Sequence, residues 1–295
     1  MVMCAKKDFM LRGVFKEHAV RFAFGNFGQL VETGILKHDT DPLSARLLGQ
    51  ALISGALATV LLDEKEKYAV RFEYDGPAKG ILLDISAAGA VRGFIRHPHL
   101  MTETGDPDEA CGEECVISVT KSVEGKVLNS GQIKSAFISP ETVLSCFFSL
   151  SDQIETEIGS ALFFCADPGA PVECACGMML QALPDCDLAY FTKLREKLIS
   201  PEAWPFLSAI DLAPEKQLAD LAAFLCGTSS VQLETAWGIT PRFECPCSPQ
   251  KLWQTARTML GEEDFRKLLS ENPSPTIRCQ FCNTEHRYFP ELLEK

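Results

Sequence analysis

The chain has 295 residues, 13 of them cysteines, and a formal net charge of −12 at neutral pH. This acidic balance excludes a general nucleic-acid binder, because such proteins need a basic surface to displace the counterions of phosphate. No apolar run approaches the roughly 18 residues needed to span a bilayer, so we expect no membrane partner.

Residues 1–185 mix strand and helix patterns and predict an α+β fold, with an N-terminal mixed β-sheet domain and packed helices. The run from Ser44 to Leu62 is apolar with one polar stripe, which is typical of a helix buried on most of its circumference. Tyr68–Tyr74 and Gly80–Ile85 are strand patterns joined by a turn at Asp75-Gly76-Pro77, which predicts a hairpin. Further strands are predicted at 91–95, 116–120 and 160–165, and a helix at 140–153.

Residues 186–238 change to short amphipathic helices and predict a helical, metastable linker. The apolar residues of the first helix are Leu188, Phe191, Leu194 and Leu198, and those of a later one are Leu218, Leu221 and Leu225. Helices with such narrow apolar faces are marginally stable without a docking partner. The alternative is an ordinary folded helical subdomain.

Residues 239–295 predict a small C-terminal Cys4 zinc domain. Cys245-Pro246-Cys247 is followed, after 31 residues, by Cys279-Gln280-Phe281-Cys282. Two close thiolate pairs can complete a tetrahedral shell around Zn²⁺ with no position left open. We therefore expect Cys245, Cys247, Cys279 and Cys282 to bind one Zn²⁺ per chain in the reduced state.

The residues between the two pairs predict a helical hairpin. Ser248 can cap the first helix, with Pro249 in its first turn and Gly261 at its end. Its predicted inner face is Leu252, Ala256, Met259 and Leu260, and that of the second helix is Phe265, Leu268 and Leu269. Short strands are expected at 276–278 and 287–289, on either side of the second pair.

Such a site links oxidation to unfolding. Zinc holds the sulfurs as thiolates, the form that oxidants attack, and oxidation of one pair removes two ligands at once. Zinc binding contributes roughly 10–16 kcal/mol in zinc-finger peptides, whereas a whole domain is stable by about 5–15 kcal/mol. The module should therefore unfold when its metal leaves.

The remaining cysteines predict a reducing, cytoplasmic location. Their number is odd and the chain start lacks an apolar signal core, which is unlike a secreted disulfide protein. Cys174-Ala175-Cys176 lies in an apolar stretch and is interpreted as buried core, with an accessory redox pair as the open alternative. Cys111 and Cys115 fall in a predicted exposed acidic loop at 103–115, where they could pair although nearby carboxylates should raise their pKa values.

Three other functions fit parts of the pattern. A thiol–disulfide oxidoreductase would use Cys279 and Cys282, but needs a reactive cysteine at a helix N-terminus. A nucleic-acid-binding zinc ribbon would need a basic surplus, whereas residues 240–295 hold eight Lys/Arg and eight Asp/Glu. A purely structural zinc ribbon remains open. The sequence has no Gly-rich phosphate loop and no nucleophile–base signature, so we expect no enzymatic activity and no use of ATP.

Taken in order, the motifs resemble those of the redox-regulated heat-shock protein 33 family of chaperones. The matching segments are Ala45-Arg-Leu-Leu-Gly49, Asp75-Gly-Pro77, Val91-Arg-Gly-Phe94, Ser151-Asp-Gln153, Gln181-Ala-Leu-Pro184, Phe243-Glu-Cys-Pro-Cys-Ser248, Cys279-Gln-Phe-Cys282 and Tyr288-Phe289. They span nearly the whole chain. One departure is Cys176-Gly177, which stands where the family has two glycines and adds a thiol.

The resemblance implies an ATP-independent holdase that prevents aggregation of unfolding client proteins. It implies that oxidation by peroxide with heat, or by hypochlorous acid, ejects zinc and forms the Cys245–Cys247 and Cys279–Cys282 disulfides. The zinc domain and linker then lose structure and expose apolar surface. It also implies a homodimer in the oxidised state.

Overall fold

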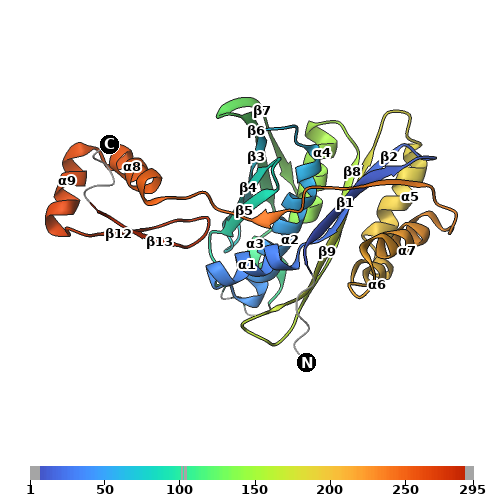
Figure 1. Cartoon of the computed structure of the whole chain (residues 1–295), viewed down its shortest axis with the longest axis horizontal. Coiled ribbons are helices and arrows are strands. Elements are labelled where there is room, and N and C mark those ends of the chain that lie inside the picture. Colours follow the sequence, from blue (N-terminus) through green and yellow to red (C-terminus); the bar gives the residue numbers. More distant parts are fainter. Residues whose placement is uncertain (1–6, 101, 103–104, 290–295) are drawn as a thin grey trace. The chain divides into compact units, whose positions relative to one another are not determined.

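The computed structural model describes residues 7–100, 102 and 105–289. The chain divides into two compact units, Met1–Phe243 and Glu244–Lys295. Both contain strands and helices (Figure 1), which confirms the predicted α+β class. The finer division of the first unit, into a sheet domain ending at 185 and a linker over 186–238, stays a prediction.

The first unit contains an antiparallel sheet in the order β10-β1-β2-β9-β8. Its strands are β1 (Phe9–Phe15), β2 (Val20–Asn26), β8 (Thr156–Phe164), β9 (Val172–Ala182) and β10 (Leu233–Trp237). Of these five strands, only β8 is predicted by the sequence pattern. Strands β2 and β9 are buried on both faces for most of their length, so they lack the polar–apolar alternation that marks a half-exposed strand.

A second sheet has the order β11-β5-β4-β3-β6-β7. Its strands are β3 (Glu66–Tyr74), β4 (Gly80–Ser86), β5 (Ala90–Ile95), β6 (Cys115–Val123), β7 (Lys126–Ser135) and β11 (Arg242–Phe243). Neighbours are antiparallel except for β11, which runs parallel to β5. Strands β3 and β4 form the predicted hairpin, and β3 alternates between buried and more exposed side chains as its sequence indicates.

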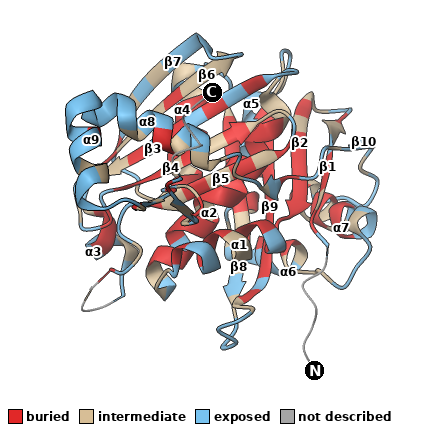
Figure 2. Cartoon of the chain, turned by 60° about the vertical axis from the view of Figure 1, so that its left-hand side comes forward, coloured by how far each residue is buried: buried red, intermediate tan, exposed pale blue. Residues whose placement is uncertain are grey.

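Helix α2 (Pro42–Ala58) is the central helix of the main apolar core. It packs against β4, β5, β8 and β9, and Figure 2 shows it buried along most of its length. Asp41 caps it by accepting from the Ser44 amide at 2.7 Å. By length and hydropathy, Pro42–Leu61 resembles a membrane span, but 78% of its most apolar window is buried inside the fold, as in a core helix.

Four shorter helical elements accompany α2. They are α1 (Gly28–His38), the 3₁₀ turn η1 (Thr59–Leu61), α3 (Pro107–Cys111) and α4 (Pro140–Ser151). Helix α1 packs against α2 and β9, and α4 packs against α2 and β8. The helix predicted at 140–153 is therefore confirmed, with its end two residues earlier.

The other face of the first sheet carries a second apolar core. It is covered by α5 (Leu188–Leu198), the 3₁₀ turn η2 (Pro201–Ala203), α6 (Trp204–Leu207) and α7 (Pro214–Cys226). Along β9, Ala175 and Met179 belong to the main core, whereas Cys176 and Met178 belong to this second one. The predicted apolar faces are buried here, except for Leu188, which lies at the start of α5 and is 56% exposed.

The second unit contains α8 (Pro249–Leu260), α9 (Glu262–Glu271), β12 (Thr276–Arg278) and β13 (Glu285–Arg287). The Ser248 hydroxyl accepts from the Lys251 amide at 3.3 Å, which confirms the predicted cap. The predicted inner face of α8 was wrong in part: Ala256 packs against the core of this unit, but Met259 is 82% exposed, and Trp253 is buried instead. The helix turns a different face toward the core of this unit from the predicted one, because the indole is the largest apolar side chain that it can bury.

Candidate metal centre

The second cysteine pair lies in a tight turn between β12 and β13. The Cys279 amide donates to the Thr284 carbonyl at 2.9 Å, and the Asn283 amide donates to the Cys279 carbonyl at 2.8 Å. Asn283 adopts a left-handed backbone with φ of 56°, which asparagine tolerates better than most residues. The turn thereby holds Cys279 and Cys282 at the same end of the short hairpin.

The first pair lies between β11 and α8 and is brought to the turn by an aromatic cluster. Trp253 on α8 packs edge-on against Tyr288 at 5.2 Å between ring centroids, and Phe265 on α9 packs against Tyr288 at 5.9 Å. Tyr288 directly follows β13. Because α8 begins two residues after Cys247, packing of Trp253 on Tyr288 draws both cysteine pairs together.

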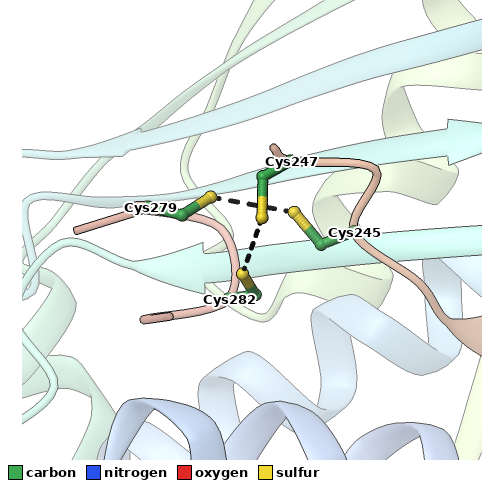
Figure 3. A group of neighbouring side chains, drawn as sticks. All are labelled: Cys245, Cys247, Cys279 and Cys282. Carbon is green, nitrogen blue, oxygen red and sulfur yellow. Dashed lines mark hydrogen bonds between the residues drawn. The ribbon is translucent and has the colours of Figure 1, made fainter. Parts of the chain in front are cut away.

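The four sulfurs point toward one another (Figure 3), and all lie within 4.8 Å of each other. The Sγ atoms of Cys245 and Cys279 are 3.7 Å apart, and those of Cys247 and Cys282 are 3.5 Å apart. A tetrahedral shell with Zn–S bonds of about 2.3 Å has edges of about 3.8 Å. The donor set and its spacing therefore fit a four-coordinate thiophilic metal ion.

The thiols perturb one another strongly. Burial, followed by hydrogen bonds with Cys282 and Cys245, raises the pKa of the Cys247 thiol well above its usual range. Burial also raises the pKa of Cys279. At Cys282 burial acts in the same direction, but hydrogen bonds from Thr284 and Cys247 outweigh it and lower the pKa to about 7. Of these three thiols, Cys282 is thus the most readily ionised in the absence of a metal.

His286 on β13 is a neighbour of this site that the sequence analysis missed. Its Nε2 lies 3.3 Å from the Cys247 sulfur. An imidazole N–H at that distance can donate to a thiolate and orient it. The sequence feature that could have identified it is its position four residues after the last cysteine, on a strand leading out of the turn.

The module has a small core of its own. In its described part the buried apolar cluster consists of Trp253, Phe265 and Tyr288, with Ala256, Leu268, Leu269 and Ile277 partly buried around it. The buried Trp253 indole N–H has no hydrogen-bond partner among the described residues, which costs about 1–3 kcal/mol. A core of this size rarely stabilises a unit below about 70 residues without a metal or disulfide.

The other cysteines lie elsewhere. Cys174 and Cys176 are on β9, 4% and 0% exposed, as predicted for core cysteines. The exposed-loop prediction for Cys111 and Cys115 was wrong, because Cys111 ends α3 and Cys115 begins β6, and both are fully buried. Burial, more than the nearby carboxylates, raises their pKa values to about 12. Residues 103 and 104 of that loop lie outside the described part.

An α+β unit followed by a small unit with four clustered cysteines, which could hold a metal ion, defines the class of protein. The model of the family described as Hsp33 protein matches residues 8–289 of this chain. The chain therefore belongs to the Hsp33 family, and this membership supports a chaperone function.

Individual relatives agree over nearly their full length. The 33 kDa chaperonin of Bacillus licheniformis is 26% identical, covering 97% of this chain and 98% of its own. The 33 kDa chaperonin of Bacillus subtilis is 25% identical, with 97% of each chain covered. A crystal structure of the 33 kDa chaperonin of Thermotoga maritima has a TM-score of 0.80 at 23% identity, covering 97% of this chain and 96% of that one. That likeness concerns the fold.

Proposed function

We propose that this chain is an ATP-independent holdase of the cytoplasm whose activity depends on the oxidation state of four cysteines. Membership in the Hsp33 family supports the chaperone part, with unfolding proteins as its clients. The observation that carries the redox part is the cluster of Cys245, Cys247, Cys279 and Cys282 in a module with a small core.

In the proposed resting state the four sulfurs hold one Zn²⁺. The ion supplies the electrostatic stabilisation that keeps four neighbouring sulfurs ionised and joins the two ends of the module. Trp253, Phe265 and Tyr288 complete the folded state by packing α8 and α9 against the residue that follows β13.

Activation is the oxidation of two thiol pairs. In each pair two thiolates form one S–S bond and give up two electrons. One hydrogen peroxide accepts them, takes two protons from solvent and becomes two waters, or one hypochlorous acid accepts them and becomes chloride and hydroxide. We propose the Cys245–Cys247 and Cys279–Cys282 pairings. The crosswise sulfurs of Cys245 and Cys279 lie 3.7 Å apart, so peptide mapping must decide the pairing.

Loss of four sulfur donors leaves the module with its aromatic cluster alone, and we propose that it unfolds. The linker over 186–238 is proposed to follow and to expose the apolar faces that α5 and α7 bury in the second core. Those faces would bind clients, and the same exposed surface would support a homodimer of the oxidised protein. We propose no catalytic role, no nucleic-acid partner and no membrane partner.

The test follows metal release and activity on the same samples. Reduced, zinc-loaded protein is titrated with hypochlorous acid while a chromogenic chelator reports zinc, and suppression of thermal aggregation of an unrelated client is measured. We expect about one zinc per chain, released in step with the gain of activity. Cys165→Ser, which removes an exposed thiol outside the cluster, is the matched control and should behave as wild type.

Two outcomes would refute the proposal. If zinc stays bound, or leaves without anti-aggregation activity, the centre is a structural site. If the oxidised protein turns over a thiol donor many times per chain, it is a thiol–disulfide oxidoreductase. The lowered pKa of Cys282 makes this second measurement necessary, although neither Cys279 nor Cys282 begins a helix.

A further inference from the structure

Cys174 and Cys176 form a second pair of thiols, far from the metal centre in the sequence and on a different element. They alternate with Ala175 on β9, so both project from the same face of the strand. That face belongs to the second apolar core. Helices α5 and α6 pack against β9 there, so the pair lies beneath the helices of the linker.

Each thiol has partners in this core. The Cys174 sulfur donates to the Ala161 carbonyl at 3.5 Å, and the Cys176 sulfur donates to the Asn26 Oδ1 at 3.7 Å. The interaction between the two side chains lowers the pKa of Cys174 and raises that of Cys176. The Gln217 side-chain amide on α7 donates to the Leu207 carbonyl at 2.7 Å and to the Phe206 carbonyl at 3.1 Å, which joins α7 to α6. Both helices contribute side chains to the apolar core that contains the pair.

The spacing of the pair permits a disulfide only after some local adjustment. Residues two apart on a strand have Cα atoms about 6.6–6.8 Å apart, at the upper limit of the 4.4–6.8 Å range of disulfides. Cys176 pairs with Asn26 in the last register position between β2 and β9, so Cys174 lies beyond the end of that ladder. The backbone at Cys174 is therefore held on the β2 side by fewer bonds than the rest of β9.

We propose that Cys174 and Cys176 are a second oxidation site, which closes to a disulfide only when α5, α6 and α7 leave the first sheet. The two thiols form one S–S bond and release two protons and two electrons, which hypochlorous acid accepts to give water, chloride and a proton. The inference rests on the proposed function only for what triggers the opening, since any loosening of these helices exposes the pair.

Closing this disulfide changes the surface on which the helices dock. It draws two side chains together on the face that also carries Met178 and Leu180 of the second core. Because interiors are closely packed, a shifted backbone at this point opposes return of the helices. The disulfide therefore retains the open state until a reductant cleaves it.

The experiment measures, peptide by peptide, how fast each cysteine of the full-length reduced protein reacts with N-ethylmaleimide. The chain supplies its own controls: Cys165 is exposed, whereas Cys111 and Cys115 are fully buried in the main core, away from the linker helices. In wild type we expect fast labelling at Cys165 and slow labelling at both buried pairs.

Two variants then loosen the linker helices without touching either thiol. Leu221→Ala removes a fully buried side chain of α7 from the second core. The milder Lys197→Met removes an ammonium group that donates to the Phe224 and Leu225 carbonyls at the end of α7, both at 3.0 Å. We expect at least about a tenfold faster labelling of Cys174 and Cys176 with no change at Cys111 and Cys115. Leu144→Ala in the main core is the matched control. It should not speed the labelling of Cys174 and Cys176 relative to that of Cys111 and Cys115.

Oxidation of the same variants tests the bond itself. After hypochlorous acid, the peptide with Cys174 and Cys176 should be two hydrogens lighter and resist alkylation until reduced, earlier in Leu221→Ala than in wild type. Equal labelling of both buried pairs, or sulfinic acid in place of the disulfide, would overturn the inference. If the metal centre oxidises and activity appears while Cys174 and Cys176 stay reduced, the inference fails and the proposed function stands. If the variants close the disulfide but wild type shows no holdase activity, the proposed function fails and the inference stands.

Discussion

A buried carboxylic acid makes the stability of the first unit depend on pH. Glu141 lies in the first turn of α4 and is 9% exposed. The Ser160 hydroxyl donates to its Oε1, and the Gln50 amide donates to its Oε2 at 3.5 Å. Burial raises its pKa to about 7, opposed by the Ser160 bond and the charge of Arg46 and assisted by the charge of Glu157.

The sign and size of the effect follow from this shift. Between pH 4.5, the ordinary pKa, and about pH 7, the folded chain holds a proton on Glu141 that the unfolded chain has lost. The contribution of protonated Glu141 to the free energy of unfolding is therefore fully present below pH 4.5 and is lost as the pH rises through 7. At about 1.4 kcal/mol for each tenfold change in proton affinity, the loss is about 3 kcal/mol.

Glu141→Gln keeps the shape of the side chain but cannot ionise. We expect the free energy of unfolding of the variant, relative to that of wild type, to rise by about 2–3 kcal/mol between pH 5 and pH 8. The measurement is urea unfolding followed by far-ultraviolet circular dichroism, with zinc and reductant held constant. All other titrating groups are shared, so they cancel in the difference. Glu173→Gln, an exposed carboxylate on β9, is the control and should show no such trend. If the difference in free energy of unfolding between Glu141→Gln and wild type does not change with pH, the reasoning is refuted.

Three further predictions concern the module. Removing the metal with a strong chelator should shift the fluorescence emission of Trp253, which is 2% exposed in the folded module, to longer wavelength. The measurement uses a Trp204→Phe/Trp237→Phe background, and an unshifted spectrum would show that the module stays folded without metal. Phe265→Ala should destabilise the module by about 3–5 kcal/mol and lower its apparent zinc affinity at least about 100-fold in chelator competition, whereas Phe163→Ala in the first unit should not. His286→Ala should weaken zinc binding about tenfold at unchanged circular dichroism, with His18→Ala as control; equal affinity would show that the contact with Cys247 plays no part.

Sequence reasoning succeeded where one local signal was enough. Strand β3 alternates cleanly because one of its faces is more exposed, and α8 begins at Ser248 because its hydroxyl can cap the helix. It missed β1, β2 and β9, and it missed the burial of Cys111 and Cys115. In β9 nearly every residue is buried, so a central strand between two apolar cores looks the same as any apolar run.

For the candidate site, the spacing of Cys245, Cys247, Cys279 and Cys282 alone determined a four-sulfur cluster, since ligand type and spacing are local properties of the chain. Tertiary packing decided the rest. Trp253 faces Tyr288 because the two lie on elements that only the folded module brings together, and His286 reaches Cys247 for the same reason. The position of Cys174 and Cys176 beneath α5–α7 likewise depends on which face of β9 those helices cover, which no pattern within β9 itself specifies.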